Sequence, residues 1–362
     1  MKRKDRTELL KTIHQDADTA KRAATPLRIQ VLQSALPSAL RVSIFEELRT
    51  NPCDKYIQWV RKVVALPIGV VRAVARCDSK EAVARAQRDM DAHITGSDVA
   101  KREILKMVCQ QAATGGMGCG SAYSIGLEGA PGTGKTHFVR TAIAGALQRP
   151  LVSIPLGGAS DASYLLGNLY TYEGSKEGRL ATALVEAGCC NPIIHFDEVD
   201  KISTTDRGTE IVSTLIHLVD PTSNVAMRDR YFHGVDLDFS RCTFVFSYND
   251  PSQVSPILLD RIKRISVETP SETERLAILR DHLVPRTQAR LRTSLVLSEA
   301  AASVLLSRNA SGGMRAMEKD VDHVVGAAQL CALCGGNNSG ALAGVTTTVL
   351  DDDGRIRGEF AK

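Results

Sequence analysis

Apolar side chains recur with helical spacing over the first quarter of the chain. Residues 1–25 are polar and basic, and they precede a stretch in which apolar positions return at intervals near 3.6, as in Ile44, Leu48 and Ile57. Such spacing places the apolar residues on one face of a helix. The pattern therefore predicts a loosely ordered basic tail followed by a helical N-terminal segment over residues 26–90.

The pattern changes over residues 91–268, where short apolar runs alternate with helical stretches. Strands are expected at 123–128, 151–154, 192–196, 242–248 and 264–268. Helices are expected between them at 135–147, 178–187 and 210–219. Alternation of this kind is typical of a parallel sheet covered by helices, and such sheets bind ligands beyond the carboxyl ends of their strands.

Residues 269–330 return to a helical pattern. Ser271 and Glu274 form a capping-box pattern that opens a helix, and helical spacing continues to residue 330. An all-α unit is expected there. The tail, residues 331–362, has two short β-prone runs on either side of Asp353-Gly354, which predicts a small hairpin.

The composition is that of a folded protein and excludes several classes. Apolar residues make up 43% and charged residues 24% of the 362 residues, which is ordinary for a globular chain of two or three compact units. The longest apolar run, residues 63–71, is too short to span a membrane. Nine cysteines are too few for a disulfide framework in so long a chain. The N-terminus shows no apolar signal segment, so a cytoplasmic or nuclear protein is expected.

Charge is unevenly distributed along the chain. Residues 1–90 contain 18 Lys and Arg against 10 Asp and Glu, whereas the remainder contains 27 against 31. A basic N-terminal region can contact nucleic acid or an acidic protein. A solvated helical surface explains the same charges, and we favour that interpretation.

Residues 129–136 match in full the phosphate-binding loop G-x-x-x-x-G-K-[ST]. Glycines let backbone N–H groups curl around phosphate oxygens, and the helix that follows points its positive end at the same anion. Lys135 is expected to reach the outer phosphates, and the Thr136 hydroxyl to bind Mg²⁺. The residues expected to contact ATP in this loop are Gly129, Ala130, Pro131, Gly132, Thr133, Gly134, Lys135 and Thr136.

Two carboxylates follow directly after the expected strand 192–196. Asp197 at the end of that strand can hold Mg²⁺, directly or through water, and Glu198 can polarise the attacking water as general base. An acidic turn after a strand is common by itself, but this one belongs to the same expected sheet as a complete phosphate loop. His195, within the strand, is expected to pack in the core rather than to take part in chemistry.

These motifs together resemble the AAA+ superfamily, and specifically the ATPase module of Lon proteases. The resemblance is carried by residues 192–201 (PIIHFDEVDK), 218–224 (LVDPTSN), 258–261 (LLDR), 156–158 (LGG), 313–315 (GMR) and 56–59 (YIQW). It covers about residues 26–330. It implies an α/β AAA+ P-loop NTPase, with a parallel sheet flanked by helices, an all-α lid and a helical N-terminal segment. It also implies ATP and Mg²⁺ as ligands.

The resemblance implies roles for further residues. His93 and Ile94 fall where that family contacts the adenine. Asn249 is similar to the sensor that orients the lytic water, and Arg261 to the arginine finger that reaches the γ-phosphate of a neighbouring subunit. Arg315 is similar to the second sensor, which couples the lid to the nucleotide. The plainer explanation is a turn-forming asparagine for Asn249, a surface cation for Arg261 and a charge at a helix end for Arg315. A finger acting in trans implies self-assembly into a hexameric or similar ring.

Two departures from the family bear on what the ATP would drive. Tyr172 falls on the pore loop, where the family grips polypeptide with an aromatic–aliphatic pair, but Glu173 replaces the aliphatic partner. A plain loop tyrosine is therefore the alternative. The residues after Arg315 do not resemble the C-terminal serine–lysine peptidase domain of Lon proteases, and no peptidase activity is expected.

We therefore expect a Lon-like AAA+ ATPase that hydrolyses ATP to remodel or unfold protein substrates, without contact to a membrane. The catalytic residues would be Lys135, Glu198, Asn249, Arg261 and Arg315. Three alternatives stay open: an ATPase ring that serves a separate protease, a nucleic-acid-associated ATPase that uses the basic N-terminal region, and a nucleotide-dependent scaffold. The acidic pair argues against the scaffold, because a scaffold needs no catalytic base.

Overall fold

The chain divides into two compact units that are built from interleaved segments. The computed structural model describes residues 25–50, 52–72, 79–113, 123–159, 161–172, 174–291, 294–297, 299–308, 313–334, 347–350 and 356–359. Unit 1 comprises Met1–Arg72, Ala159–Pro192 and Ser203–Cys242, and unit 2 comprises Ala73–Gly158, Ile193–Ile202 and Thr243–Lys362. The expected domain 91–268 is thus distributed over both units, and the expected basic tail lies almost entirely outside the described residues.

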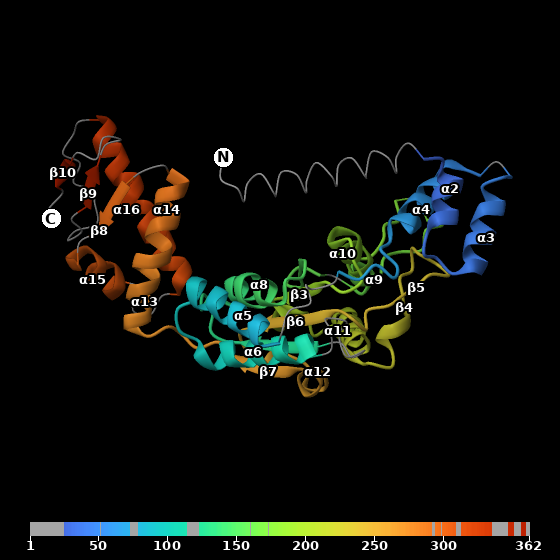
Figure 1. The fold of residues 1–362 in the computed structure, drawn as a ribbon, viewed down its shortest axis with the longest axis horizontal. Helices are drawn as coiled ribbons and strands as arrows, with labels where there is room; N and C mark the ends of the chain where they lie inside the picture. Colours follow the sequence, from blue (N-terminus) through green and yellow to red (C-terminus); the bar gives the residue numbers. More distant parts are fainter. Residues whose placement is uncertain are drawn as a thin grey trace. The chain divides into compact units, whose positions relative to one another are not determined.

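Unit 2 is built on a five-stranded parallel sheet in the order β2-β3-β6-β1-β7. Strands β3, β6 and β7 of this sheet are labelled in Figure 1. Its strands are β1 (Tyr123–Glu128), β2 (Leu151–Pro155), β3 (Ile193–Asp197), β6 (Thr243–Tyr248) and β7 (Lys263–Ser266). All five were predicted from the sequence, to within two residues at either end. The central strands β3 and β6 are buried along nearly their whole length, as their continuous apolar runs require.

Helices from three parts of unit 2 pack on this sheet and share one apolar core with it. They are α5 (Ser79–His93), α6 (Asp98–Ala113) and the helical stretch α7 (Lys135–Phe138), η1 (Val139–Ile143) and α8 (Ala144–Leu147). A short helix, α12 (Pro256–Arg261), precedes β7, and 3-10 turns follow β3 and β6 as η2 (Val199–Lys201) and η4 (Pro251–Gln253). The α/β fold expected from the alternating pattern is confirmed.

The C-terminal part of unit 2 is mainly helical. It contains α13 (Glu272–Ile278), η5 (Leu279–Leu283), α14 (Val284–Leu291), α15 (Glu299–Arg308) and α16 (Met314–Cys334) around their own apolar core. The predicted capping box is present: the Ser271 hydroxyl accepts from the Glu274 N–H, and the Glu274 carboxylate accepts from the Ser271 N–H. We refer to residues 269–334 as the lid.

A small antiparallel sheet accompanies the lid helices. The predicted tail hairpin is found as β9 (Thr347–Leu350) and β10 (Ile356–Glu359). The strand β8 (Ser294–Leu297) pairs with β9 as well, which the helical pattern of this region did not predict. A strand of four residues between two helices is too short to show its own period.

Unit 1 is mainly helical. Its elements are α2 (Leu27–Gln33), α3 (Ser38–Glu47), α4 (Asp54–Ala65), α9 (Ser163–Leu166), α10 (Arg179–Ala187), α11 (Asp206–Val219), η3 (Asn224–Ala226) and the short strands β4 (Met227–Arg228) and β5 (Asp236–Leu237). None of the described helices, in either unit, is long and apolar enough to cross a membrane.

Trp59 on α4 joins distant segments of unit 1. Its indole N–H donates to the carbonyl oxygen of Tyr231 at 2.8 Å, and its ring stacks on Tyr56 and packs against Tyr170. Lys62, one turn further along the helix, lies over the Tyr231 ring and contacts the Glu177 carboxylate. These contacts explain why segments more than 100 residues apart in the sequence form one unit with the N-terminal helices.

Candidate functional site

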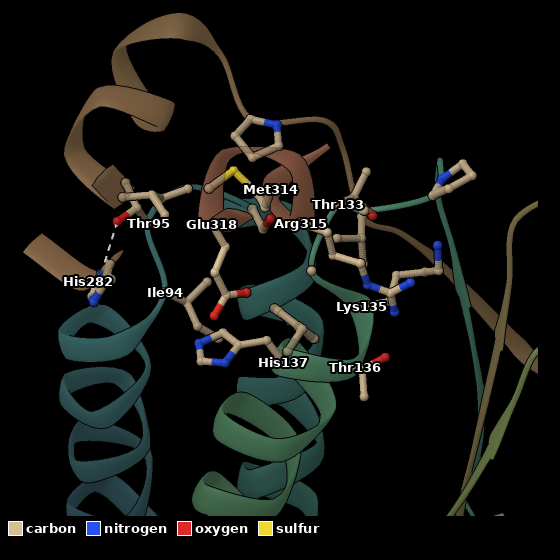
Figure 2. A pocket seen from close by; sticks show the side chains of 18 of the residues that line it. Ile94, Thr95, Thr133, Lys135, Thr136, His137, His282, Met314, Arg315 and Glu318 are labelled. Carbon is tan, nitrogen blue, oxygen red and sulfur yellow. Dashed lines mark hydrogen bonds between the residues drawn. The ribbon is translucent and has the colours of Figure 1, made fainter. Parts of the chain in front are cut away.

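A cavity of about 530 Å³ in unit 2 gathers most of the predicted site residues. Its walls come from the end of α5, the loop before α7, the carboxyl ends of the central strands, and the lid (Figure 2). The predicted residues that line it are His93, Ile94, Pro131, Gly132, Thr133, Gly134, Lys135, Thr136, Asp197, Glu198, Asn249 and Arg315. A cavity beyond the carboxyl ends of parallel strands is the position in which this class of sheet binds ligands.

The loop before α7 has the backbone shape that an anion site requires. Gly132 and Gly134 have φ angles of +78° and +91°, in the left-handed region where a side chain would be strained. Helical structure begins directly at Lys135 and continues to residue 147. The unpaired N–H groups of the first helical turn therefore face the loop, as in phosphate-binding sites.

The Lys135 ammonium is held at the mouth of this loop. It donates to the carbonyl oxygens of Gly129 and Ala130, at 2.7 and 3.0 Å, and to the Asn249 side-chain oxygen at 2.7 Å. Burial lowers the pKa of Lys135, and the charge of Arg315 lowers it further, whereas nearby carboxylates oppose the shift. Gly129 and Ala130 thus contribute to the site through their carbonyl groups, although they do not line the cavity.

Asp197 ends β3 with its two oxygens in different surroundings. Oδ1 accepts hydrogen bonds from the Ser247 hydroxyl at 2.5 Å and from the backbone N–H of Glu198 at 3.0 Å. Oδ2 lies 3.5 Å from the Thr136 hydroxyl, which donates to it. Oδ1 is therefore held by two hydrogen bonds, whereas Oδ2 faces the phosphate loop and has one longer contact there.

The oxygen atoms of Thr136 and Asp197 that face each other fit a Mg²⁺ ion. Among the described residues, no cluster of three or more His, Cys, Asp or Glu side chains could hold a metal by itself. Mg²⁺ bound with a nucleotide needs only one or two protein oxygens, because phosphates and water supply the remaining ligands. The Thr136 hydroxyl and Asp197 Oδ2 are oxygens of this kind, next to the loop that would hold the phosphates.

Glu198 adopts an unusual backbone conformation beside a glycine. Its φ of +59° is left-handed, which is uncommon for a residue other than glycine and often marks a functional position. The side chain is exposed and lines the cavity. A Cβ atom on Gly157 would lie 2.4 Å from Glu198 Oε2, so the glycine makes room for this carboxylate. Gly157 was part of the family resemblance, but its role appears only in the structure.

Asn249 connects Lys135 to a buried carboxylate. Its side-chain N–H lies 3.4 Å from Asp200 Oδ2, and the same Asp200 oxygen lies 3.6 Å from the Lys201 ammonium. The Asp200 side chain is buried, and its Oδ1 has no hydrogen-bond partner among the described residues. Sequence reasoning did not assign Asp200 a role, although its place three residues after Asp197 in the DEVDK motif was the available signal.

The lid contacts the phosphate loop through its backbone. The Met314 N–H donates to the Gly132 carbonyl oxygen at 2.9 Å, which brings the beginning of α16 onto the loop. Arg315 follows in the first turn of α16 and lines the cavity (Figure 2). This backbone contact places Arg315, the predicted second sensor, at the same cavity as Lys135.

Histidines that the sequence did not single out line the opposite wall of the cavity. His282 of the lid lies 3.4 Å from the Thr95 hydroxyl, and His137 lies 3.4 Å from the His93 carbonyl oxygen (Figure 2). Burial lowers the pKa of His137; the contact with the His93 carbonyl oxygen opposes this shift, and the charges of Arg286 and the neighbouring histidines add to it. Only their position on the folded chain distinguishes these histidines from the others.

Besides Gly129 and Ala130, two further predicted residues, Arg261 and Tyr172, do not line this cavity. Arg261 is exposed at the end of α12 and is not among the cavity-lining residues that the structure describes. Tyr172, in unit 1, is 66% exposed and borders a separate hollow with Leu169 and Arg230. The neighbouring Glu173 lies outside the described residues, so the departure that it represents is not tested.

Comparisons with known proteins agree with this geometry. Residues 125–270 match the family described as ATPase family associated with various cellular activities (AAA). The chain is 32% identical over 275 residues to the Lon protease of Salinispora arenicola (strain CNS-205), which covers 73% of this chain and 35% of that protein.

Two further relatives show the same uneven coverage. The chain is 31% identical over 310 residues to Lon protease 4 of Sorangium cellulosum (strain So ce56), covering 82% of this chain and 37% of that protein. It is 41% identical over 165 residues to a Lon protease homolog of Acanthamoeba polyphaga mimivirus, covering 45% and 16%. The matched regions thus span about a third or less of the length of these relatives.

Proposed function

This chain is an AAA-family ATPase related to Lon proteases, and from that membership we propose that the cavity of unit 2 binds ATP with Mg²⁺ and hydrolyses it to ADP and phosphate. One observation supports the proposal above others. Lys135 of the phosphate loop contacts Asn249 after β6, and Thr136 contacts Asp197 after β3, so three separate motifs meet around one point.

Each residue then has a distinct part in the reaction. The Thr136 hydroxyl and Asp197 would hold Mg²⁺, which would supply positive charge that offsets the negative charge of the phosphates. Lys135 offsets the charge that develops on the transferred phosphoryl group. Glu198 accepts a proton from the attacking water, and Asn249, anchored by Asp200, orients that water. His93 and Ile94 on the opposite wall would contact the adenine.

Replacing Glu198 tests the catalytic assignment. Glu198→Gln keeps the shape of the side chain but cannot accept the proton, so we expect fluorescent ADP to bind as it does to the parent while ATP hydrolysis falls by at least about a hundredfold. Glu272→Gln, at an exposed carboxylate in the first turn of α13, is the matched control and should leave both properties unchanged. Hydrolysis at the parental rate by Glu198→Gln would show that another group is the base.

We also propose that the site is completed by a neighbouring subunit in a hexameric or similar ring. The support is the position of Arg261, which is exposed and does not line its own chain's cavity. An arginine that stabilises the transition state from a neighbour contributes orders of magnitude in rate. Arg261→Ala should therefore lose hydrolysis while retaining nucleotide binding. Mixing it with Glu198→Gln should restore activity in part, because some interfaces then combine an intact base with an intact arginine.

The hydrolysis is proposed to drive the remodelling of protein substrates, at the loop that carries Tyr172. The Lys55 ammonium on α4 donates to the carbonyl oxygens of Thr171 and Tyr172, at 2.7 and 2.9 Å, and Trp59 packs against Tyr170 at the beginning of the loop. The backbone of the loop is thereby held while the Tyr172 ring faces solvent. An anchored, exposed aromatic ring suits contact with an extended polypeptide of any sequence.

An ATPase assay with unfolded protein tests this part separately. We expect casein to stimulate hydrolysis and Tyr172→Ala to abolish the stimulation without lowering the basal rate. Val185→Ala, at an exposed apolar residue of α10 in the same unit, is the control. Stimulation that survives Tyr172→Ala would contradict the role of this loop. Stimulation by DNA that is lost with rising salt would favour the nucleic-acid alternative instead.

The same assay bears on the remaining predictions. Cleavage of casein only after a second protein is added would identify a ring that serves a separate protease. The absence of peptidase activity and the cytoplasmic location also stay predictions. The first is checked by incubating the chain alone with casein and ATP, and the second by cell fractionation.

A further inference from the structure

A line of hydrogen bonds crosses the sheet beneath the candidate metal ligand. It begins at Ser153 on β2, passes through both ring nitrogens of His195 on β3, continues to Ser247 on β6, and ends at Asp197 Oδ1. The distances are 3.3 Å from Ser153 Oγ to His195 Nδ1, 3.0 Å from His195 Nε2 to Ser247 Oγ, and 2.5 Å from Ser247 Oγ to Asp197 Oδ1. His195 and Ser247 are both completely buried.

The sheet register brings these side chains onto one face. Ser153 lies directly opposite His195 in the β2–β3 pair, and His195 lies opposite Val245 in the β3–β6 pair. Ser247 is two residues beyond Val245 and Asp197 two residues beyond His195, so all four polar side chains point to the same side. His195 is packed in the core, as the sequence predicted, and it also has a hydrogen-bond partner at each ring nitrogen.

The proton positions along this line follow from the chemistry of its two ends. The Asp197 carboxylate can only accept, so the Ser247 hydroxyl proton points to it; the alternative acceptor, the Phe196 carbonyl oxygen, is farther away at 3.4 Å. The Ser247 oxygen must then accept from His195, which places the ring proton on Nε2. A neutral ring accepts at the other nitrogen, so the Ser153 hydroxyl donates to Nδ1.

We propose that His195 is a positioning residue for the metal ligand Asp197, acting through Ser247 as the neutral Nε2–H tautomer. This inference rests on the proposed function, because it assigns Asp197 to Mg²⁺. When every hydroxyl and N–H in a line of hydrogen bonds points the same way, each hydrogen bond strengthens the next. The Ser247 hydroxyl and the Glu198 N–H then hold Asp197 Oδ1, and Oδ2 is left facing Thr136 and the metal position.

The same reasoning predicts which property His195 controls. Hydrogen bonds behind a metal ligand fix its orientation, and removing them typically costs ten- to a hundredfold in metal affinity or activity. Nucleotide binding without metal depends on the phosphate loop and should not depend on Asp197 orientation. A change at His195 should therefore alter the Mg²⁺ requirement and leave metal-free nucleotide binding intact.

Variants at position 195 test the proposal in the full-length chain. His195→Leu removes both hydrogen bonds, and we expect it to raise the Mg²⁺ concentration that gives half-maximal binding of fluorescent ADP by about tenfold. Binding of the same probe in EDTA should stay within about twofold of the parent. His195→Gln, which can donate and accept at its two ends, should recover most of the Mg²⁺ affinity. Ile194→Val, the neighbouring buried residue on the other face of β3, is the packing control.

A double variant tests whether His195 and Ser247 act through one line of hydrogen bonds or affect Mg²⁺ affinity independently. Ser247→Ala removes the link between His195 and Asp197, so His195→Leu should have no further effect on Mg²⁺ affinity in that background. The proposal would be overturned if the two substitutions lowered Mg²⁺ affinity additively. It would also be overturned if His195→Leu needed no more Mg²⁺ than the parent. Either result would mean that His195 does not act through Ser247.

The nitrogen spectrum of the parent gives a readout that needs no catalysis. With ¹⁵N-labelled histidine, the ring signals lost in His195→Gln identify His195, and their pattern distinguishes an Nε2–H from an Nδ1–H ring. An Nδ1–H tautomer would overturn the proposal even in an active enzyme. A parent that neither hydrolyses ATP nor binds Mg²⁺–ADP would instead refute the proposed function, and the tautomer could still be read.

Discussion

Adding one methyl group to Gly313 tests whether the lid must touch the phosphate loop for nucleotide to bind. In Gly313→Ala the new Cβ would lie 2.8 Å from the Gly132 Cα and 3.0 Å from the Pro131 carbonyl oxygen. Both neighbours are backbone atoms, so neither can move aside by rotating a side chain. Because carbon atoms pack best at about 3.5–4.0 Å, the beginning of α16 has to retreat by roughly 0.7 Å or more.

That displacement acts on the backbone hydrogen bond by which Met314 of the lid contacts Gly132 of the loop. The Met314 N–H to Gly132 carbonyl distance of 2.9 Å would lengthen past the range of a useful hydrogen bond. A lost hydrogen bond of this kind costs about 1 kcal/mol, which corresponds to about a fivefold loss of affinity. We expect Gly313→Ala to bind fluorescent ADP about fivefold more weakly, with a matching rise in the KM for ATP.

The same helix offers a control for this substitution. Gly326, also in α16, is exposed, and a Cβ there meets no atom within 4 Å. Gly326→Ala should bind nucleotide like the parent, and it should stabilise the helix by up to about 1 kcal/mol because alanine is the better helix former. If Gly313→Ala also binds ADP with the parental affinity, the contact between lid and loop does not contribute to nucleotide binding, and the reasoning fails.

Three further predictions rest on single contacts. Gly157→Ala should displace Glu198 and lower kcat at least about tenfold, which corresponds to about 1.4 kcal/mol in the activation free energy. Gly158→Ala, where a Cβ meets nothing within 4 Å, should keep the parental kcat, and steady-state ATPase rates compare the two variants. Trp59→Phe should lower the free energy of unfolding by about 1–3 kcal/mol in urea titrations, because the carbonyl oxygen that its indole N–H contacts stays buried without a partner. Burial raises the pKa of Asp229 to about 6, so the native state holds a proton that the unfolded chain has released. The parent should therefore lose about 2 kcal/mol more than Asp229→Asn as pH rises from about 4 to about 6, measured by urea unfolding across that range.

The sequence alone was sufficient for the sheet and for most of the residues that gather at its carboxyl edge. Five short runs predicted five strands, and those of β3 and β6 are the most continuously apolar because these strands are buried on both faces. The phosphate loop was predictable for a similar reason. Its glycines, lysine and threonine are required by local backbone geometry and by direct contact with phosphate, so their order in the sequence carries the information.

Other features depend on contacts between distant segments and were not predicted. The strand β8 forms because residue 294 and its neighbours pair with β9, more than 50 residues later. Segments 159–192 and 203–242 form one unit with the N-terminal helices because Trp59 and its neighbours contact them. Periodicity reports the environment of one element and contains no information about which other element supplies that environment.

The candidate site divides in the same way. Asp197, Glu198 and Lys135 were assigned from motifs, because each has a function that its residue type and spacing require. The contacts of four other residues became visible only in the fold. Strand register brings Ser247 to Asp197 and His195 to Ser247, Gly157 lies beside Glu198, and the lid brings Gly313 to Gly132 of the phosphate loop. A hydrogen bond across a sheet joins residues that no local pattern relates. The sequence by itself therefore indicated which groups are proposed to act on ATP, and the tertiary structure showed which side chains contact those groups.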